Sequence, residues 1–251
     1  MSQTLLVSDV HISADLTRVN AGFMHLLDTL PANCHRVIVL GDLFEVWVGD
    51  DFASPTLSAI EVAFKRLTAR GVELLFCHGN RDFLMDAGPA GSEAFSARVG
   101  GRLMAEHEVI DLHGTPVLLM HGDQLCLDDS AYMAFRAQAR SEAWQQGILS
   151  QPLDQRMQLA EFWRMQSQAA NSNKPENIMD VNADEVVRVL TEANVLTLVH
   201  GHTHRPQQHP HLLADGREAT RFVLGDWREA EGQAVIAWAN DSGIHLEDFR
   251  F

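Results

Sequence analysis

Five short polar clusters follow five apolar runs along the 251-residue chain. The clusters combine carboxylates, imidazoles and one amide, and they occupy residues 9–11, 41–42, 79–82, 121–123 and 201–204. The apolar runs before them are typical of buried strands and occupy residues 5–7, 37–40, 74–76, 117–120 and 195–199. Ligands of an open α/β sheet gather beyond the carboxyl ends of its strands. The five clusters therefore predict one shared site.

The clusters offer seven candidate metal ligands with oxygen or nitrogen donors and no thiolate. They are Asp9, His11, Asp42, Asn80, His121, His202 and His204. This mixed set suits Mn²⁺, Fe²⁺ or Zn²⁺ better than Mg²⁺ or Ca²⁺, which prefer oxygen ligands. Seven ligands are too many for one ion, whereas two ions about 4 Å apart, bridged by a carboxylate and a hydroxide, use them naturally. The sequence thus predicts a dinuclear site.

Metal-assisted hydrolysis is the chemistry that such a site supports. Two cations lower the pKa of a bridging water and bind phosphoryl oxygens. Arg81 is next to the ligand Asn80, so we expect its charge to stabilise the transition state. We expect Asp82 and Asp123 to orient Arg81 or a ligand imidazole.

The remaining sequence predicts the elements that position these clusters. Apolar residues recur at helical spacing in residues 17–30 and 55–70, between the strand-like runs. Strands that alternate with helices favour a layered α/β sheet. Three further runs near the C-terminus look like hairpin strands, at residues 221–224, 233–239 and 243–249. We therefore predict a β-sandwich of two sheets flanked by helices.

Residues 125–177 lack strand-like runs and interrupt this alternation. Pro152 divides the segment into two predicted helices, at residues 130–145 and 153–171. The segment is either an inserted helical cap over the active site or an ordinary helical pair that covers a sheet face. We adopt the first interpretation, with residues 1–124 and 178–251 as the core, because binding elements often lie on such insertions.

Composition disfavours a long nucleic-acid substrate, because the net charge is −15 and only Lys65 and Lys174 are lysines. Three widely separated cysteines indicate a reducing compartment. We see no signal peptide, and no apolar run approaches the roughly 20 residues that span a bilayer. We therefore expect a cytoplasmic protein, with peripheral membrane contact left open.

The order of the motifs, DxH, GD, GN-x-D, H and GHxH, resembles the calcineurin-like metallophosphoesterase superfamily, and this resemblance covers residues 9–204. It implies a metallophosphoesterase-type β-sandwich with a pair of metal ions. One ion would be held by Asp9, His11, Asp42 and His204. The other would be held by Asn80, His121, His202 and the bridging Asp42.

Arg81 departs from the superfamily pattern, in which histidine usually follows the asparagine. With this arginine, residues 79–84 resemble the UDP-2,3-diacylglucosamine pyrophosphatases of lipid A biosynthesis in Gram-negative bacteria. Further stretches are similar to that enzyme family, at residues 41–47, 121–129, 170–174, 178–182 and 200–206.

This second resemblance implies hydrolysis of UDP-2,3-diacylglucosamine to 2,3-diacylglucosamine 1-phosphate (lipid X) and UMP, with two Mn²⁺ ions. It implies peripheral attachment to the cytoplasmic face of the inner membrane. As the composition indicates, we expect no nucleic-acid partner, and no obligate protein partner is evident. The implied catalytic residues are Asn80, Arg81 and Asp82. The implied substrate contacts are Asn80, Arg81, Asp129, Ser167, Asn171, Lys174 and His202. Apolar cap residues would then line an acyl-chain pocket.

Two alternatives remain open at this stage. The same dimetal core could belong to a generic phosphodiesterase or phosphoprotein phosphatase. A scaffold that has lost catalysis could also keep the fold, although degenerate members lose ligands first and all seven are present here.

Overall fold

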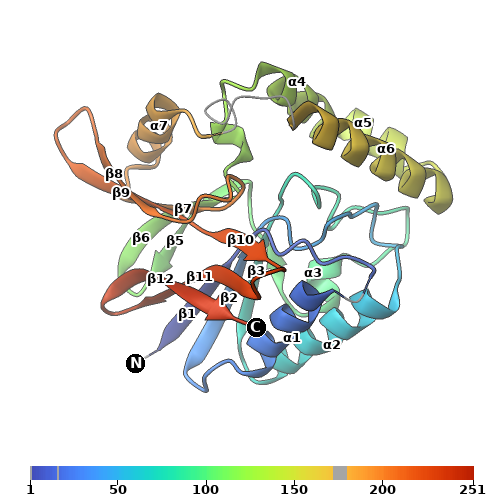
Figure 1. The fold of residues 1–251 in the computed structure, drawn as a ribbon, viewed down its shortest axis with the longest axis horizontal. Coiled ribbons are helices and arrows are strands. Elements are labelled where there is room, and N and C mark those ends of the chain that lie inside the picture. Colours follow the sequence, from blue (N-terminus) through green and yellow to red (C-terminus); the bar gives the residue numbers. More distant parts are fainter. Residues whose placement is uncertain (1, 16, 172–179) are drawn as a thin grey trace.

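Two β-sheets and the helices around them form the structure, which is a computed structural model describing residues 2–15, 17–171 and 180–251 (Figure 1). The sheets pack on each other through an apolar layer that includes Leu6, Ile38 and Leu75 from one sheet and Leu119 and Val199 from the other. The predicted two-sheet α/β architecture is confirmed.

The first sheet has the strand order β10-β11-β1-β2-β3-β4, with β12 paired to β11. Strands β1 to β4 are parallel to one another, and they are β1 (Gln3–Val7), β2 (Cys34–Leu40), β3 (Glu73–Cys77) and β4 (Arg102–Leu103). The antiparallel strands are β10 (Gly225–Arg228), β11 (Gln233–Asn240) and β12 (Gly243–Arg250). The parallel pairing brings the carboxyl ends of β1, β2 and β3 to one edge.

Three helices cover the outer face of the first sheet, namely α1 (Arg18–Asp28), α2 (Pro55–Ala69) and the short α3 (Phe95–Arg98). Side chains alternate along β1, so that Leu5 packs against α1 residues such as Phe23 while Leu6 faces the second sheet. Thr17 and Ser54 cap the first two helices by accepting backbone N–H groups. The two helices predicted in this region are therefore present.

The second sheet has the order β5-β6-β7-β9-β8. Its strands are β5 (His107–Leu112), β6 (Thr115–Met120), β7 (Thr197–His200), β8 (Gln208–Leu212) and β9 (Glu218–Val223). Helix α7 (Ala183–Ala193) covers it through Val186 and Leu190. Residues 221–223 belong to β9, which forms a hairpin with β8 and also pairs with β7. This predicted hairpin strand therefore lies in the second sheet, whereas the other two C-terminal runs lie in the first.

The segment that interrupts the sheets folds into a single-turn helix, η1 (Asp123–Leu125), and three longer helices, α4 (Ser130–Ala139), α5 (Glu142–Leu149) and α6 (Leu153–Asn171). Figure 1 shows α4, α5 and α6 together, outside both sheets. One helix was predicted over residues 130–145, but the structure has two. Helix α4 ends before Arg140, and α5 begins after Ser141.

Arg156 of α6 attaches these helices to the first sheet. Its guanidinium is 2% exposed and forms a bidentate ion pair with Asp51, in the loop after β2. The same guanidinium donates to the carbonyls of Val48 and, at 3.0 Å, Gln151. A buried arginine with four accepting atoms fixes α6 against this loop. No helix among the described residues has the length and apolar character needed to cross a bilayer.

Candidate dinuclear metal site

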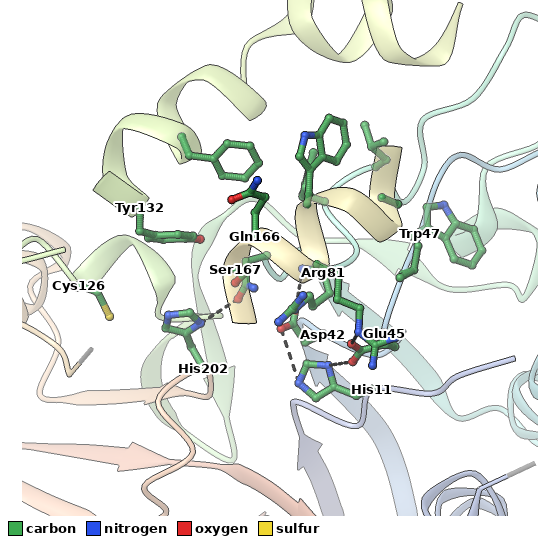
Figure 2. Close-up of a pocket in the computed structure, with 18 of the residues that line it drawn as sticks. His11, Asp42, Glu45, Trp47, Arg81, Cys126, Tyr132, Gln166, Ser167 and His202 are labelled. Carbon is green, nitrogen blue, oxygen red and sulfur yellow. Dashed lines mark hydrogen bonds and ion pairs between the residues drawn. The ribbon is translucent and has the colours of Figure 1, made fainter. Parts of the chain in front are cut away.

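All seven predicted metal ligands meet where the two sheets adjoin. Asp9, His11, Asp42 and Asn80 follow strands β1, β2 and β3 of the first sheet, whereas His121, His202 and His204 follow β6 and β7 of the second. Figure 2 shows His11, Asp42 and His202 converging from these separate loops.

Two groups of candidate donors adjoin at the site and share Asp9. The ligand atoms of Asp9, Asp42 and His121 lie within 4.8 Å of one another, and so do those of Asp9, His11 and His204. Asp42 Oδ2 is 3.8 Å from His11 Nε2 and 3.7 Å from His121 Nε2. Asp42 is thus close to one imidazole of each group, as a carboxylate that would bridge two ions requires.

Asn80 completes one of these groups through its amide oxygen, Oδ1. That oxygen is 3.0 Å from His121 Nε2 and 2.8 Å from His202 Nδ1. His121 Nδ1 lies 2.9 Å from the Leu40 carbonyl, which can only accept, so Nδ1 carries the proton of the neutral ring and leaves Nε2 with a lone pair. Lone pairs from His121, Asn80 and Asp42 then converge without a hydrogen between them, which is the environment that a divalent cation satisfies.

The backbone at five ligands adopts the left-handed conformation. Positive φ angles occur at Asp9 (53°), His11 (55°), Asp42 (51°), His202 (66°) and His204 (53°). This region costs a non-glycine residue about 1–2 kcal/mol. Five left-handed residues at one site indicate that the fold accepts a loss of local stability in order to direct these side chains to one point.

Burial and crowding shift the pKa values of the ligands. Burial raises the pKa of Asp42 to about 6, although His121 and His11 oppose the change. Burial lowers the pKa of His11, but the Glu45 hydrogen bond and the carboxylates of Asp42 and Asp9 outweigh it and raise that pKa to about 9. Burial and the nearby His121 lower the pKa of His202 to about 4, so His202 is neutral and able to donate its lone pair at pH 7.

Asp82 supports the loops that carry the ligands. Its carboxylate is fully buried and accepts the backbone N–H groups of Asp42 (3.2 Å), Leu43 (2.7 Å) and Gly79 (2.8 Å). A Cβ added at Gly79 would overlap the Asp42 carboxylate, so the two loops need a glycine there. Asp82 thus acts on the loop backbone rather than on the guanidinium of Arg81.

Asp123 anchors α4 rather than a ligand imidazole. Its Oδ2 accepts from the Tyr132 hydroxyl at 2.6 Å and from Arg136 Nε at 2.8 Å. The Tyr132 ring in turn stacks on His202, with ring centroids 5.9 Å apart. Asp123 therefore connects the second sheet with α4 beside the metal ligands.

A cavity of about 800 Å³ opens between the metal ligands and helices α4 to α6 (Figure 2). Five predicted substrate contacts line it, namely Asn80, Arg81, Asp129, Ser167 and His202. Lys174 and the side chain of Asn171 lie outside the described residues. The wall away from the ligands is largely apolar and includes Val46, Trp47, Val48, Phe83, Leu84, Ala131, Phe135, Ile148, Ala160 and Trp163.

Glu45 and Arg164 also line the cavity, and the sequence argument missed both. Glu45 Oε2 lies 3.0 Å from His11 Nδ1, and Glu45 Oε1 lies 2.9 Å from Arg164 Nε. The sequence signals for Glu45 were its position three residues after Asp42 and its place in the family-like stretch 41–47.

Comparison with known proteins gives consistent matches along the whole chain. A model of the calcineurin-like phosphoesterase family matches residues 3–206. The chain is 46% identical to a UDP-2,3-diacylglucosamine hydrolase of Cellvibrio japonicus, over 98% of both chains. It is 42% identical to the enzyme of that name from Chromohalobacter salexigens, over 99% of this chain and 98% of the relative. The Klebsiella pneumoniae enzyme of that name is also 42% identical, over 99% of both chains.

Proposed function

The chain belongs to the calcineurin-like phosphoesterase family, and from this we propose that it hydrolyses the pyrophosphate bond of UDP-2,3-diacylglucosamine. The products are 2,3-diacylglucosamine 1-phosphate and UMP. The observation that carries the proposal is the cavity, because it joins the metal ligands to a long apolar wall in one space of about 800 Å³. A diphosphate fits the first part and acyl chains fit the second.

Two metal ions would be held by the seven ligands, and we propose Mn²⁺ for both because the donors mix oxygen and nitrogen. Such ions supply a water of lowered pKa and bind phosphoryl oxygens. Asp42 Oδ2 lies 3.8 Å from His11 Nε2 and 3.7 Å from His121 Nε2, so it would bridge the two ions. His121 is held in its tautomer by the Leu40 carbonyl.

We propose that the guanidinium of Arg81 stabilises the negative charge that develops on the phosphoryl oxygens in the transition state. Its backbone N–H donates to Asp42 Oδ1 at 2.7 Å, and its side chain lines the cavity. A guanidinium in this place can form two parallel hydrogen bonds to a phosphoryl group. We propose that Tyr132 contacts the substrate through its ring, because its hydroxyl donates a hydrogen bond to Asp123.

We further propose that residues 125–177 are a cap over the site and that the protein attaches peripherally to the cytoplasmic face of the inner membrane. The diacylated substrate supports this location, because its chains reside in a bilayer. Half-exposed Phe162 and Met165 on α6 support it as well, since exposed apolar residues grouped on one helix mark contact surfaces.

Purified protein incubated with Mn²⁺ and micromolar UDP-2,3-diacylglucosamine tests the activity through the release of UMP. Absence of turnover by protein with a full metal content would refute the proposal. A small chromogenic phosphodiester serves as the comparison substrate. A higher kcat/KM for that ester would favour a generic phosphodiesterase, because the apolar wall would then contribute nothing to catalysis.

A further inference from the structure

One carboxylate contacts both a metal ligand and a helix of the segment above the site. Glu45 Oε2 faces His11 Nδ1 at 3.0 Å, and Glu45 Oε1 faces Arg164 Nε of α6 at 2.9 Å. Figure 2 shows Glu45 beside His11 and Arg81 at the floor of the cavity. The two oxygens of Glu45 therefore serve two partners that come from distant parts of the chain.

The contact with His11 is an ion pair at the distance from which a carboxylate can orient a metal-binding imidazole. A proton on Nδ1 directed at Glu45 leaves the lone pair of His11 on Nε2, which faces Asp42. A carboxylate in this position fixes the tautomer and raises the basicity of the ligand. The charge of Glu45 thus contributes to metal affinity without touching the ion.

The contact between Glu45 and Arg164 lies at the boundary between two cavities. Glu45 and Arg164 line both the large cavity and a second one of about 260 Å³, which also reaches Asp9 and His204. The guanidinium of Arg164 is 46% exposed, so water competes for it and its ion pair with Glu45 is weak by itself. Glu45 therefore adds a small, charge-dependent contribution to the docking of α6, beside the main anchor at Arg156.

We propose that Glu45 is a positioning residue that couples metal binding at His11 to the docking of α6 through Arg164. An ion on His11 orders the imidazole and so fixes the Glu45 carboxylate in the orientation that Arg164 needs. By thermodynamic reciprocity, a docked α6 strengthens binding of that ion by the same factor. The inference rests on the metal site and holds whichever phosphate compound is hydrolysed.

Metal affinity provides the first measurement, by titration of metal-free protein with Mn²⁺ in competition with a chelating indicator. Glu45→Gln keeps the shape but loses the charge, and we expect a 10- to 100-fold weaker binding of one ion. Arg164→Met leaves the contact of Glu45 with His11 intact, and we expect a loss of about threefold, because coupling through an exposed pair is small. Arg188→Met is the matched control, since Arg188 is 51% exposed, lies on helix α7 and pairs with Glu185.

Hydrogen exchange of α6 provides the second measurement and separates coupling from a local effect on His11. Addition of Mn²⁺ should slow amide exchange in residues 153–167 of the wild-type protein and of Arg188→Met. The same addition should have little effect on these amides in Glu45→Gln and Arg164→Met. A Mn²⁺-induced slowing of equal size in all four proteins would overturn the proposal, as would wild-type metal affinity in Glu45→Gln.

These readouts are independent of turnover. A protein that binds Mn²⁺ as expected but releases no UMP would refute the proposed substrate and leave the coupling standing. If Glu45→Gln did not fold, the hydrogen-exchange comparison of Arg164→Met with wild type would test the proposal. The side chain of Arg164 is half-exposed, so its replacement creates no buried cavity.

Discussion

Replacement of Asp51 by asparagine should loosen α6 while the metal ligands stay in place. Asp51 holds the guanidinium of Arg156 with both carboxylate oxygens, one of them 2.8 Å from the arginine. Loss of one partner of a fully buried pair costs about 3–5 kcal/mol. Because the Asp51 side chain is 31% exposed, water recovers part of this loss, and we expect about 1–3 kcal/mol.

Hydrogen exchange in α6 is the direct assay for this change. A loss of 1–3 kcal/mol in the local unfolding free energy corresponds to exchange that is about 5- to 150-fold faster in residues 153–167. Metal content should equal that of the wild type, and KM for the nucleotide lipid should rise because α6 forms one wall of the cavity. The matched control is Asp28→Asn, whose partner Arg66 is exposed, and it should change stability by less than about 0.5 kcal/mol.

The pH dependence provides an independent check on the same pair. The hydrogen bond from Arg156 holds the pKa of Asp51 below its ordinary value. The stabilisation is therefore present above about pH 4 and is lost as the pH falls through the lowered pKa. The difference between wild type and Asp51→Asn should shrink below about pH 4. Equal exchange of α6 in both proteins at pH 7 would refute the assignment of Arg156 as its anchor.

Three further predictions concern the site and its surroundings. Arg81→Ala should lower kcat by about 100-fold or more with unchanged metal content, and a near-normal kcat would show that Arg81 is only structural. Asp82→Asn should destabilise the protein by about 2 kcal/mol or more in urea unfolding, because an amide N–H would face backbone donors, and its metal affinity should fall. Burial and then Asp86 raise the pKa of Asp50 to about 7, so the native state binds this proton more tightly than the unfolded chain. The resulting stabilisation is full below about pH 4 and lost as the pH rises through about 7. Asp50→Asn should therefore be more stable than wild type by about 2 kcal/mol at pH 8 and no more stable at pH 4, as measured by urea unfolding.

The convergence of the candidate metal ligands could be predicted from the sequence because each one follows a strand within a few residues. Apolar runs reveal strands, and parallel strands place their carboxyl ends at one edge, so Asp9 and Asp42 were expected to meet without knowledge of the full topology. The ligand set required only the residue types and this rule.

The contacts of α6 could not be predicted in the same way. Arg156 is 105 residues from Asp51 in the chain, and Arg164 and Glu45 are similarly distant. Ion pairs between separate elements leave no periodic pattern in the sequence. A buried, paired arginine such as Arg156 cannot be told there from an exposed one. The sequence predicted the strand at residues 221–224 but not its neighbours β7 and β8, because strand periodicity defines a face and not a partner.

The position of the metal ligands at the junction of the two sheets has a consequence for the lifetime of the folded protein. Each candidate group, Asp9–His11–His204 and Asp9–Asp42–His121, takes residues from both sheets. An ion in either group would add a reversible cross-link between layers that are held by apolar packing and by hydrogen bonds such as that from His121 to the Leu40 carbonyl. Such a link forms only after the sheets have docked, so it should slow unfolding more than it speeds folding. Metal supply would then govern the kinetic stability of this protein as well as its turnover.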